Sequence, residues 1–512
     1  MSHRDPQAHS YDAVPYESKP LQPTHPDHLA VMARLHGLAA PDTTACRVLE
    51  IGCATGGNLL PMALSLPGSQ FVGIDVSAGQ IETGERMRRE LQLDNARLIA
   101  GSIVDADLGA EPFDYVICHG VWSWVPEVVQ RSILATCARA LSPHGVAYVS
   151  YNTYPGWHLR SMMRDMLLFH VRATDEPQQR IARSREFVEF LLRTSGGDDT
   201  AFARFVGEEA RLLAKASDTY VFHEHLEADN RPVHFKDFVA GAADAGLRFV
   251  GEAVDDEHVA RRAEVAEFLD RHAQDPIERG QYVDFLQNRT FRRSLLCRAA
   301  APVARVEPGG DDDPVRSLWL GSPMRPQSPA PDCHGEAIET FTGPGGQQLQ
   351  IGHPWLKLAF LALGRRWPEC VPFDQLATEV AAERNAVPPP DELREILGAL
   401  HECHRGGVLK LQPHRGIARR QGGSRPLGSP LARWMARSGD RVGSLRHELV
   451  ELRPVDRLVL QLLDGRTDRG ALALALRRSA AAASVPLPAG AETELAQSLD
   501  LLGIAGMLLP TP

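Results

Sequence analysis

The chain has 512 residues, a formal net charge of -10 and a pI near 6.1. Hydrophobic residues make up 43% and charged residues 23%, which excludes a mainly disordered chain, a fibrous repeat and a membrane protein. Proteins that depend on phosphate contacts are normally basic, so nucleic acid is an unlikely main partner.

The eight scattered cysteines include no CxxC pair, which gives no support to a metal site and favours a reduced, intracellular protein. The polar N-terminus has no apolar core of a signal peptide, and no run of about 18 apolar residues occurs anywhere. We therefore expect no membrane span and a cytoplasmic location.

Short apolar segments alternate with helical ones in the first 156 residues. We expect strands at 47–51, 70–74, 97–100, 113–118 and 146–151, and helices at 56–66, 78–93 and 126–141. Ser77 with Gln80 three residues later forms a capping-box pattern at the start of one helix. This alternation predicts an α/β fold with a doubly wound, Rossmann-like parallel sheet over residues 1–156.

The remaining chain divides by composition. Residues 157–222 are highly charged and predict a helical insertion, and 223–305 contain two further strand patterns, at 247–253 and 289–299, that we expect to complete the first sheet. Residues 306–345 are rich in Pro, Gly and Asp and predict a linker. Residues 346–414 outline a winged-helix-like domain in a mainly α-helical C-terminal half, and 415–512 predict a basic linker and a helical domain.

The segment 48–58 reads VLEIGCATGGN: a strand, a glycine-rich turn and then a helix. Ala54 and Thr55 break the dinucleotide fingerprint GxGxxG, and Glu50 would repel a phosphate. A cationic, phosphate-free nucleoside fits better, and S-adenosylmethionine (SAM) is such a ligand. Asp75, which ends the second strand, would accept hydrogen bonds from its ribose hydroxyls.

The alternative is a glycine turn that only packs a helix against the sheet, but the acidic, glycine and serine positions in this strand order favour SAM. The expected cofactor-binding residues are Glu50, Gly52, Cys53, Ala54, Gly56, Asn58, Asp75, Val76, Ser102, Ile103 and His119. Cys53 is interpreted as a small residue in a tight space rather than a redox group.

Several motifs together resemble the bacterial class I SAM-dependent methyltransferases that carry a methyltransferase regulatory domain, and most of all the rickettsial-type protein-lysine methyltransferases. The motifs lie at residues 11–16, 48–58, 71–80, 118–126, 147–157, 220–225 and 281–292, with weaker ones at 353–355 and 445–465. The resemblance implies methyl transfer from SAM to a protein, with lysine as the first candidate. A small-molecule N- or O-methyltransferase and a non-catalytic SAM-binding protein remain the alternatives.

Methyl transfer from SAM requires positioning and exclusion of water rather than a metal. We expect Tyr16, Trp122, Tyr154 and Trp157 to line a substrate channel, because aromatic faces suit methylammonium groups. For Trp122 the alternative is core packing. His119 is the candidate catalytic base, with simple packing as its alternative.

Two further groups of residues have structural interpretations. Asp284, Arg289 and Arg292 are polar positions in an apolar pattern, for which we favour a structural ion network over substrate recognition. The acidic third helix of the winged-helix-like domain does not suit DNA reading, so we expect the C-terminal half to dock a protein substrate. The sequence leaves a homodimer open.

Overall fold

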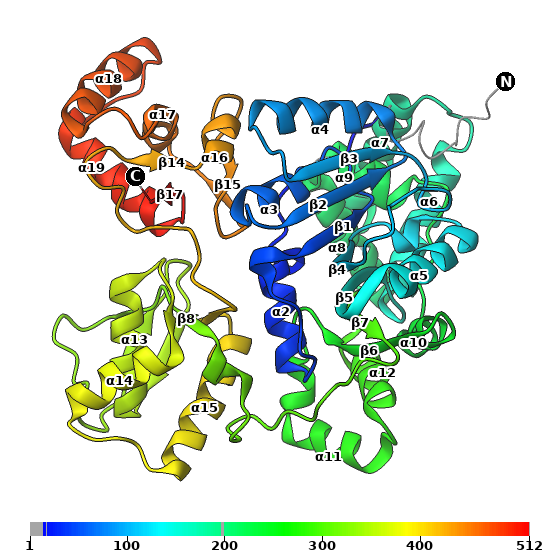
Figure 1. Ribbon diagram of the computed structural model, residues 1–512. Coiled ribbons are helices and arrows are strands. Elements are labelled where there is room, and N and C mark those ends of the chain that lie inside the picture. Colours follow the sequence, from blue (N-terminus) through cyan, green and yellow to red (C-terminus); the bar gives the residue numbers. More distant parts are fainter. Residues whose placement is uncertain (1–13, 17, 196–198, 511–512) are drawn as a thin grey trace.

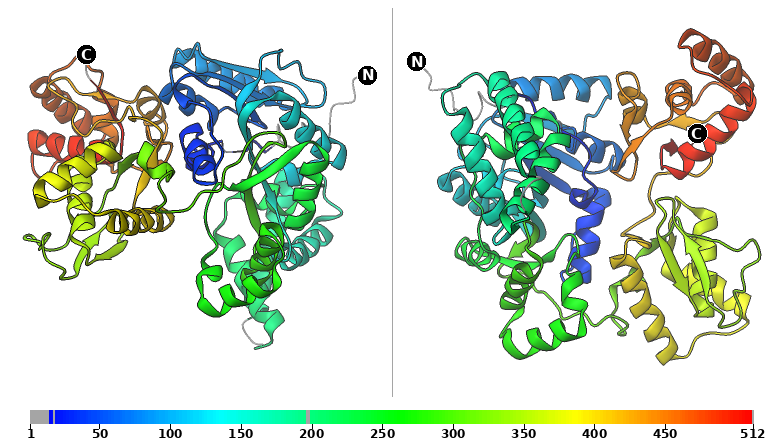
Figure 2. Two further views of the ribbon diagram at one scale, coloured as in Figure 1. Left: turned by 60° about the horizontal axis from the view of Figure 1, so that its bottom comes forward. Right: turned by 180° about the vertical axis from the view of Figure 1, so that it is seen from behind.

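The computed structural model describes residues 14–16, 18–195 and 199–510. Tyr11, which opens the first of the motifs above, lies outside these residues. The chain forms a central sheet with a helical insertion packed beside it and two smaller lobes formed by the C-terminal half (Figures 1 and 2). None of the helices in the described part combines the length and the apolar character that crossing a bilayer requires.

The central sheet has seven strands in the order β3-β2-β1-β4-β5-β7-β6. The strands are β1 Arg47–Ile51, β2 Gln70–Asp75, β3 Ala96–Ala100, β4 Phe113–Cys118, β5 Leu141–Asn152, β6 Leu247–Glu252 and β7 Phe291–Arg298. The first five are parallel, whereas β7 lies antiparallel between β5 and β6. Both late strands therefore join the first sheet, which confirms that prediction.

Helices cover both faces of the sheet because its strands are buried on both sides. Val48 packs on one face with α2 (Pro26–Leu35), α3 (Leu59–Ser65) and α4 (Ala78–Glu90). Leu49 packs on the other face with α5 (Glu127–Ala140) and α10 (Phe235–Asp244). Ser77 caps α4 by accepting a hydrogen bond of 3.1 Å from the Gln80 amide, as the capping box predicts.

The helical insertion has its own apolar core. It consists of α6 (Gly156–Val171), α7 (Pro177–Ser195), α8 (Ala201–Lys215) and α9 (Asp218–His225). The expected boundary at residue 222 is wrong by a few residues, because it divides α9, and α9 packs as a whole against α6 and α7.

A buried ion network ties the late strands to α12 (Pro276–Gln287), which follows α11 (Ala263–His272) along the chain. Arg292 on β7 donates to Asp284 of α12 at 2.8 Å and to Glu252 of β6 at 2.7 Å, while Arg289 donates to Asp284 at 2.7 Å. These charges are fully or nearly fully buried, so each needs its partners. The structural interpretation of Asp284, Arg289 and Arg292 is confirmed.

The predicted linker at 306–345 is wrong from about residue 315 onward, because Val315 and Leu318 are already completely buried in an apolar core. Strand β8 (Trp319–Gly321) pairs with β12 (Val371–Pro372) and β13 (Lys410–Gln412), and Phe341 is completely buried. Strand β10 (Glu339–Thr342) pairs with β9 (Arg325–Pro326) and β11 (Gln348–Ile351). These strands form one core with α13 (Pro354–Arg366), α14 (Phe373–Arg384) and α15 (Pro390–Arg405), so the middle domain begins well before residue 346.

The predicted basic linker after residue 414 is also folded. It contains α16 (Pro430–Met435) and the hairpin β15–β16 (Arg441–Gly443 and Leu449–Glu451), and it packs on the C-terminal helices. Those helices are α17 (Pro454–Leu462), α18 (Arg469–Ala482) and α19 (Ala491–Ile504), with the short pair β14 (Leu427–Gly428) and β17 (Leu508–Leu509) alongside. The Trp434 indole donates to Glu90 of α4 at 2.7 Å, so this domain contacts the sheet domain directly.

Candidate cofactor and active site

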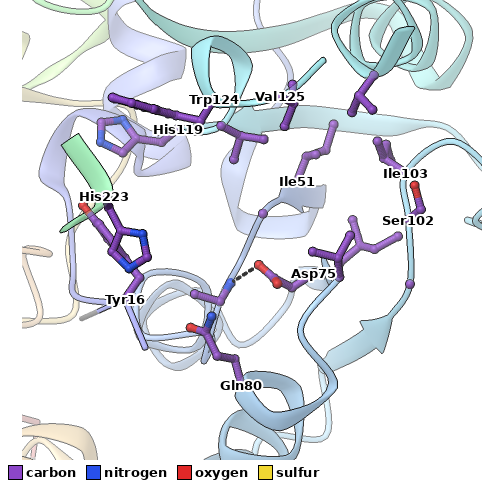
Figure 3. Close-up of a pocket in the computed structure, with 18 of the residues that line it drawn as sticks. Tyr16, Ile51, Asp75, Gln80, Ser102, Ile103, His119, Trp124, Val125 and His223 are labelled. Atoms are coloured by element: carbon purple, nitrogen blue, oxygen red, sulfur yellow. Dashed lines mark hydrogen bonds between the residues drawn. The ribbon is translucent and has the colours of Figure 1, made fainter. Parts of the chain in front are cut away.

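A cavity of about 1090 Å³, measured with its open mouth, lies at the carboxyl ends of β1, β2 and β4. The strand order reverses at this point, with β2 on one side of β1 and β4 on the other, so the loops diverge and leave a crevice. Figure 3 shows two ends to this cavity. We call the side with Asp75, Ser102 and Ile103 the β2–β3 end, and the side with Tyr16, His119, Trp124 and His223 the α9 end. Glu224, which follows His223 on α9, also lines the cavity and is counted with the α9 end.

At the β2–β3 end, backbone amides hold the Asp75 carboxylate in place. One oxygen accepts from the Ala54 amide at 2.8 Å, and the other accepts from the Ser77 amide at 2.9 Å. Ile51, Ile74 and Ile103 supply apolar walls next to it. A carboxylate beside an apolar slot is the arrangement that a ribose with its purine base requires, because the hydroxyls need acceptors and the base needs apolar contact.

The glycine turn brings its backbone to the cavity. Gly52 has φ +74°, and a Cβ at this position would lie 2.2 Å from the Cγ2 atom of Val121. Any side chain here would therefore be strained and would clash. Gly52, Ala54 and Val76 line the cavity as the sequence predicts, whereas Cys53 and Gly56 do not. Burial raises the pKa of the Cys53 thiol well above its usual range, so Cys53 is an inert packing residue.

Glu50 does not line the cavity but lies buried at the end of β1. Its Oε1 accepts from the Asn58 amide nitrogen at 2.6 Å, while Oε2 is buried without a hydrogen bond among the described residues. Burial raises the Glu50 pKa to about 8, although the Asn58 bond opposes this shift. A buried carboxylate with one oxygen left without a donor fits the neighbourhood of a cationic ligand, which would lower the Glu50 pKa again.

Asn58 extends this chain of contacts into the C-terminal domain. Its side-chain oxygen accepts from the Leu21 amide at 2.9 Å and lies 2.7 Å from Nε2 of His447. His447 follows strand β15, and burial lowers its pKa well below the usual range, so its ring is neutral. The C-terminal domain thus contacts Asn58, and Asn58 in turn holds Glu50.

At the α9 end, His119 and Trp124 follow β4, and the other side chains come from distant segments. His119 Nδ1 lies 2.9 Å from the Tyr148 hydroxyl, and burial, together with Arg293, lowers the His119 pKa to about 4. Tyr16 comes from the N-terminal arm, and its ring centroid lies 5.8 Å from that of His223 on α9. Three separate parts of the chain therefore meet here.

Only one of the four expected channel residues, Tyr16, lines this cavity. Trp122 is 7% exposed and packs edge-on against Tyr151 and Phe238, at 5.8 and 5.3 Å between ring centroids. Trp157 is 1% exposed and packs behind Trp124. Tyr154 is half-buried and stacks on His158, away from the cavity. The short 3-10 turn at Trp122–Trp124 directs Trp122 inward and leaves Trp124 at the cavity.

The sequence prediction included none of Gln80, Trp124, His223 and Glu224 among the site residues, although all four line the cavity. His223 and Glu224 lie in the motif at 220–225, which carries two histidines around a carboxylate on a short helix. That cluster was the available signal. Nothing local in the sequence placed it beside β4.

The sheet order, the glycine turn and Asp75 at the switch point define a class I SAM-dependent methyltransferase. The chain matches the family described as "Methyltransferase domain" over residues 49–147, "Predicted methyltransferase regulatory domain" over 217–298 and "PKMT, C-terminal winged helix domain" over 424–502. The third match assigns a winged-helix domain to residues 424–502, whereas the sequence pattern predicts one at 346–414.

The chain is 33% identical over 476 residues to the uncharacterized protein RP789 of Rickettsia prowazekii, covering 90% of this chain and 84% of that one. It also resembles the solved structure of PKMT2 from Rickettsia typhi, with a TM-score of 0.85 and 26% identity over 96% of this chain and 100% of the other. A second structure of PKMT2, in complex with AdoHcy, gives a TM-score of 0.84 at 27% identity, again over 96% of this chain and 100% of the other.

The chain belongs to this family of SAM-dependent methyltransferases with a regulatory domain. It is an enzyme that uses SAM as its methyl donor.

Proposed function

We propose that this enzyme transfers the methyl group of SAM to lysine side chains of a protein substrate. The observation that carries the proposal is the likeness to PKMT2 along nearly the whole chain, including the C-terminal half. A methyltransferase that acts on a small molecule has no use for two further folded domains beside its sheet. The middle and C-terminal domains together form a second half large enough to dock a protein.

The cavity supports this proposal in its division of roles. Asp75 would accept hydrogen bonds from the ribose hydroxyls of SAM. The apolar slot at Ile103 would hold adenine, and Gly52 and Ala54 would border the methionine part. The bound cofactor supplies an activated methyl group on a sulfonium. The α9 end then offers aromatic faces and a carboxylate, which suit an incoming amine and its methylated product.

Lysine must lose a proton before it can attack. With a reference pKa near 10.4, deprotonation at pH 7 costs about 4.6 kcal/mol. A desolvated cavity lowers this cost because it disfavours the ammonium form. The α9 end, with a carboxylate in its lining, is therefore suited to a lysine acceptor.

The test uses purified protein, tritiated SAM and a host-cell lysate. Label that enters protein and is recovered as methyllysine after hydrolysis supports the proposal, and a lysate whose lysines have been reductively methylated beforehand should then take up little. Asp75→Ala serves as the inactive control. SAM binding by calorimetry without label in protein would favour a small-molecule methyltransferase, and label recovered on another residue would exclude lysine.

A further inference from the structure

Glu224 is a carboxylate at the α9 end that has no structural task. It lies on α9 and lines the same cavity as Asp75 and His119. Within the part of the chain that the structure describes, no hydrogen bond or ion pair engages its carboxylate. By contrast, the neighbouring acidic residue Glu227 holds His223 at 2.9 Å and does not reach the cavity. Glu224 is thus placed toward the cavity rather than used to hold α9.

The groups around Glu224 keep it poised between its two protonation states. Burial raises its pKa to about 7, and Arg160, His223 and Arg164 oppose that shift. The two arginines come from α6, which packs against α9. The other titratable groups on α9 itself are Asp218, Tyr220, His223 and His225. A proton acceptor works best when its pKa lies near the working pH. Burial and position alike distinguish Glu224 from the exposed carboxylates of the insertion.

His119, the base expected from the sequence, is less suited to this task. Its Nδ1 is already engaged with the Tyr148 hydroxyl at 2.9 Å, and its pKa of about 4 makes it a weak proton acceptor. Being neutral, it also offers no attraction to an ammonium group. A carboxylate supplies both attraction and proton acceptance.

Resting on the proposed function, we propose that Glu224 is a catalytic residue: its carboxylate binds the substrate lysine ammonium and accepts the proton that the amine must lose. The amine nitrogen then uses its lone pair to form the new N–C bond to the methyl group. The S–C bond breaks, its electron pair stays on sulfur as a neutral thioether, and the positive charge moves to the methylammonium product. The proton on Glu224 returns to solvent when the product leaves.

The test compares Glu224→Gln with wild type across pH, using tritiated SAM and lysate protein as the acceptor. We expect the variant to label about 10²- to 10⁴-fold more slowly at pH 7. Its rate should then rise about tenfold per pH unit toward pH 10, because the free amine fraction grows without help. The wild-type rate should level off above about pH 7. SAM affinity, measured by calorimetry, should stay within about twofold.

Two controls separate catalysis from folding. Glu208→Gln removes an exposed carboxylate from α8 of the same insertion and should leave both rate and pH profile unchanged. Glu224→Asp retains a carboxylate and should recover much of the rate that the amide loses, which a purely structural role would not explain.

Equal pH profiles for wild type and Glu224→Gln would overturn the assignment of Glu224 while leaving lysine methylation intact. A loss of SAM affinity that accounts for the whole loss of rate would make Glu224 a cofactor-binding residue instead. If wild-type protein labels no lysine, the proposed function fails, and the role of Glu224 fails with it.

Discussion

The β2–β3 end of the cavity is built by loops that directly follow neighbouring strands, whereas the α9 end combines the N-terminal arm, the loop after β4 and a helix of the insertion. At the first end, backbone amides hold the one charged group, Asp75. At the second, side chains from separate elements contact one another, as Tyr16 and His223 do. The difference teaches that the end proposed to hold the common donor is built locally, whereas the end proposed to receive the acceptor depends on the whole fold.

The largest effect should follow from Asp75→Ala. Two charge-assisted hydrogen bonds to the ribose would be lost, each contributing about 1.5–3 kcal/mol, so the Kd for SAM should rise at least about a hundredfold. Calorimetry measures this directly. Asp94→Ala, which removes an exposed carboxylate before β3, is the matched control and should bind normally. An unchanged Kd for Asp75→Ala would mean that the β2–β3 end does not hold adenosine.

Acid should destabilise the fold, and two buried histidines contribute to this loss: His119, which lines the α9 end, and His225, which lies on α9 beside it. Burial lowers the pKa of His119 and of His225 to about 4 in the folded protein, against 6.5 when unfolded. The unfolded state therefore takes up protons first, so stability is complete above pH 6.5 and is lost as the pH falls toward 4. The loss should be about 1.4 kcal/mol per histidine for each pH unit in this window.

Urea unfolding between pH 7 and 5 checks this expectation. His225→Gln should reduce the pH dependence, while His144→Gln, at an exposed position, should leave it unchanged. A pH-independent stability across this window would contradict the assignment of neutral, buried histidines to the α9 end.

A smaller effect is expected at Asn58, which contacts His447 of the C-terminal domain. His447→Ala removes the 2.7 Å contact to Asn58 and should cost about 1–2 kcal/mol of stability. A double-mutant cycle with Asn58→Ala should show a coupling of about 0.5 kcal/mol or more. Independent effects of the two substitutions would show that Asn58, and the Glu50 carboxylate that it holds, do not rely on the C-terminal domain.

The smallest effect should come from Tyr16→Ala. Tyr16 is 45% exposed, so its truncation removes little buried apolar surface and should hardly change the free energy of unfolding. We expect turnover to fall about three- to tenfold through lost aromatic contact with the acceptor, and the Kd for SAM to stay within about twofold. A larger change in Kd than in turnover would place Tyr16 with the donor rather than the acceptor.

The sheet strands, Asp75 and the glycine turn were predictable because short apolar runs and turn residues report local geometry. The place of Glu224 in the cavity was not, since it depends on how α9 packs beside the residues that follow β4. The tryptophans were misplaced because a single 3-10 turn decides which of Trp122 and Trp124 faces inward. The segment at 306–345 concealed buried residues such as Leu320 and Phe341 behind its polar composition, because strands of two to four residues leave hardly any periodicity.

The position of β7 has a consequence for how the chain is made. This strand fills the place between β5 and β6 yet ends only at Arg298, so the edge of β5 stays unpaired until residues far downstream leave the ribosome. At about 5–20 residues per second, that delay lasts roughly 7 to 30 s. An open strand edge invites pairing with other chains. Chains released before β7 is synthesised should therefore aggregate. Lower growth temperatures or added chaperones should raise the yield of the full-length enzyme.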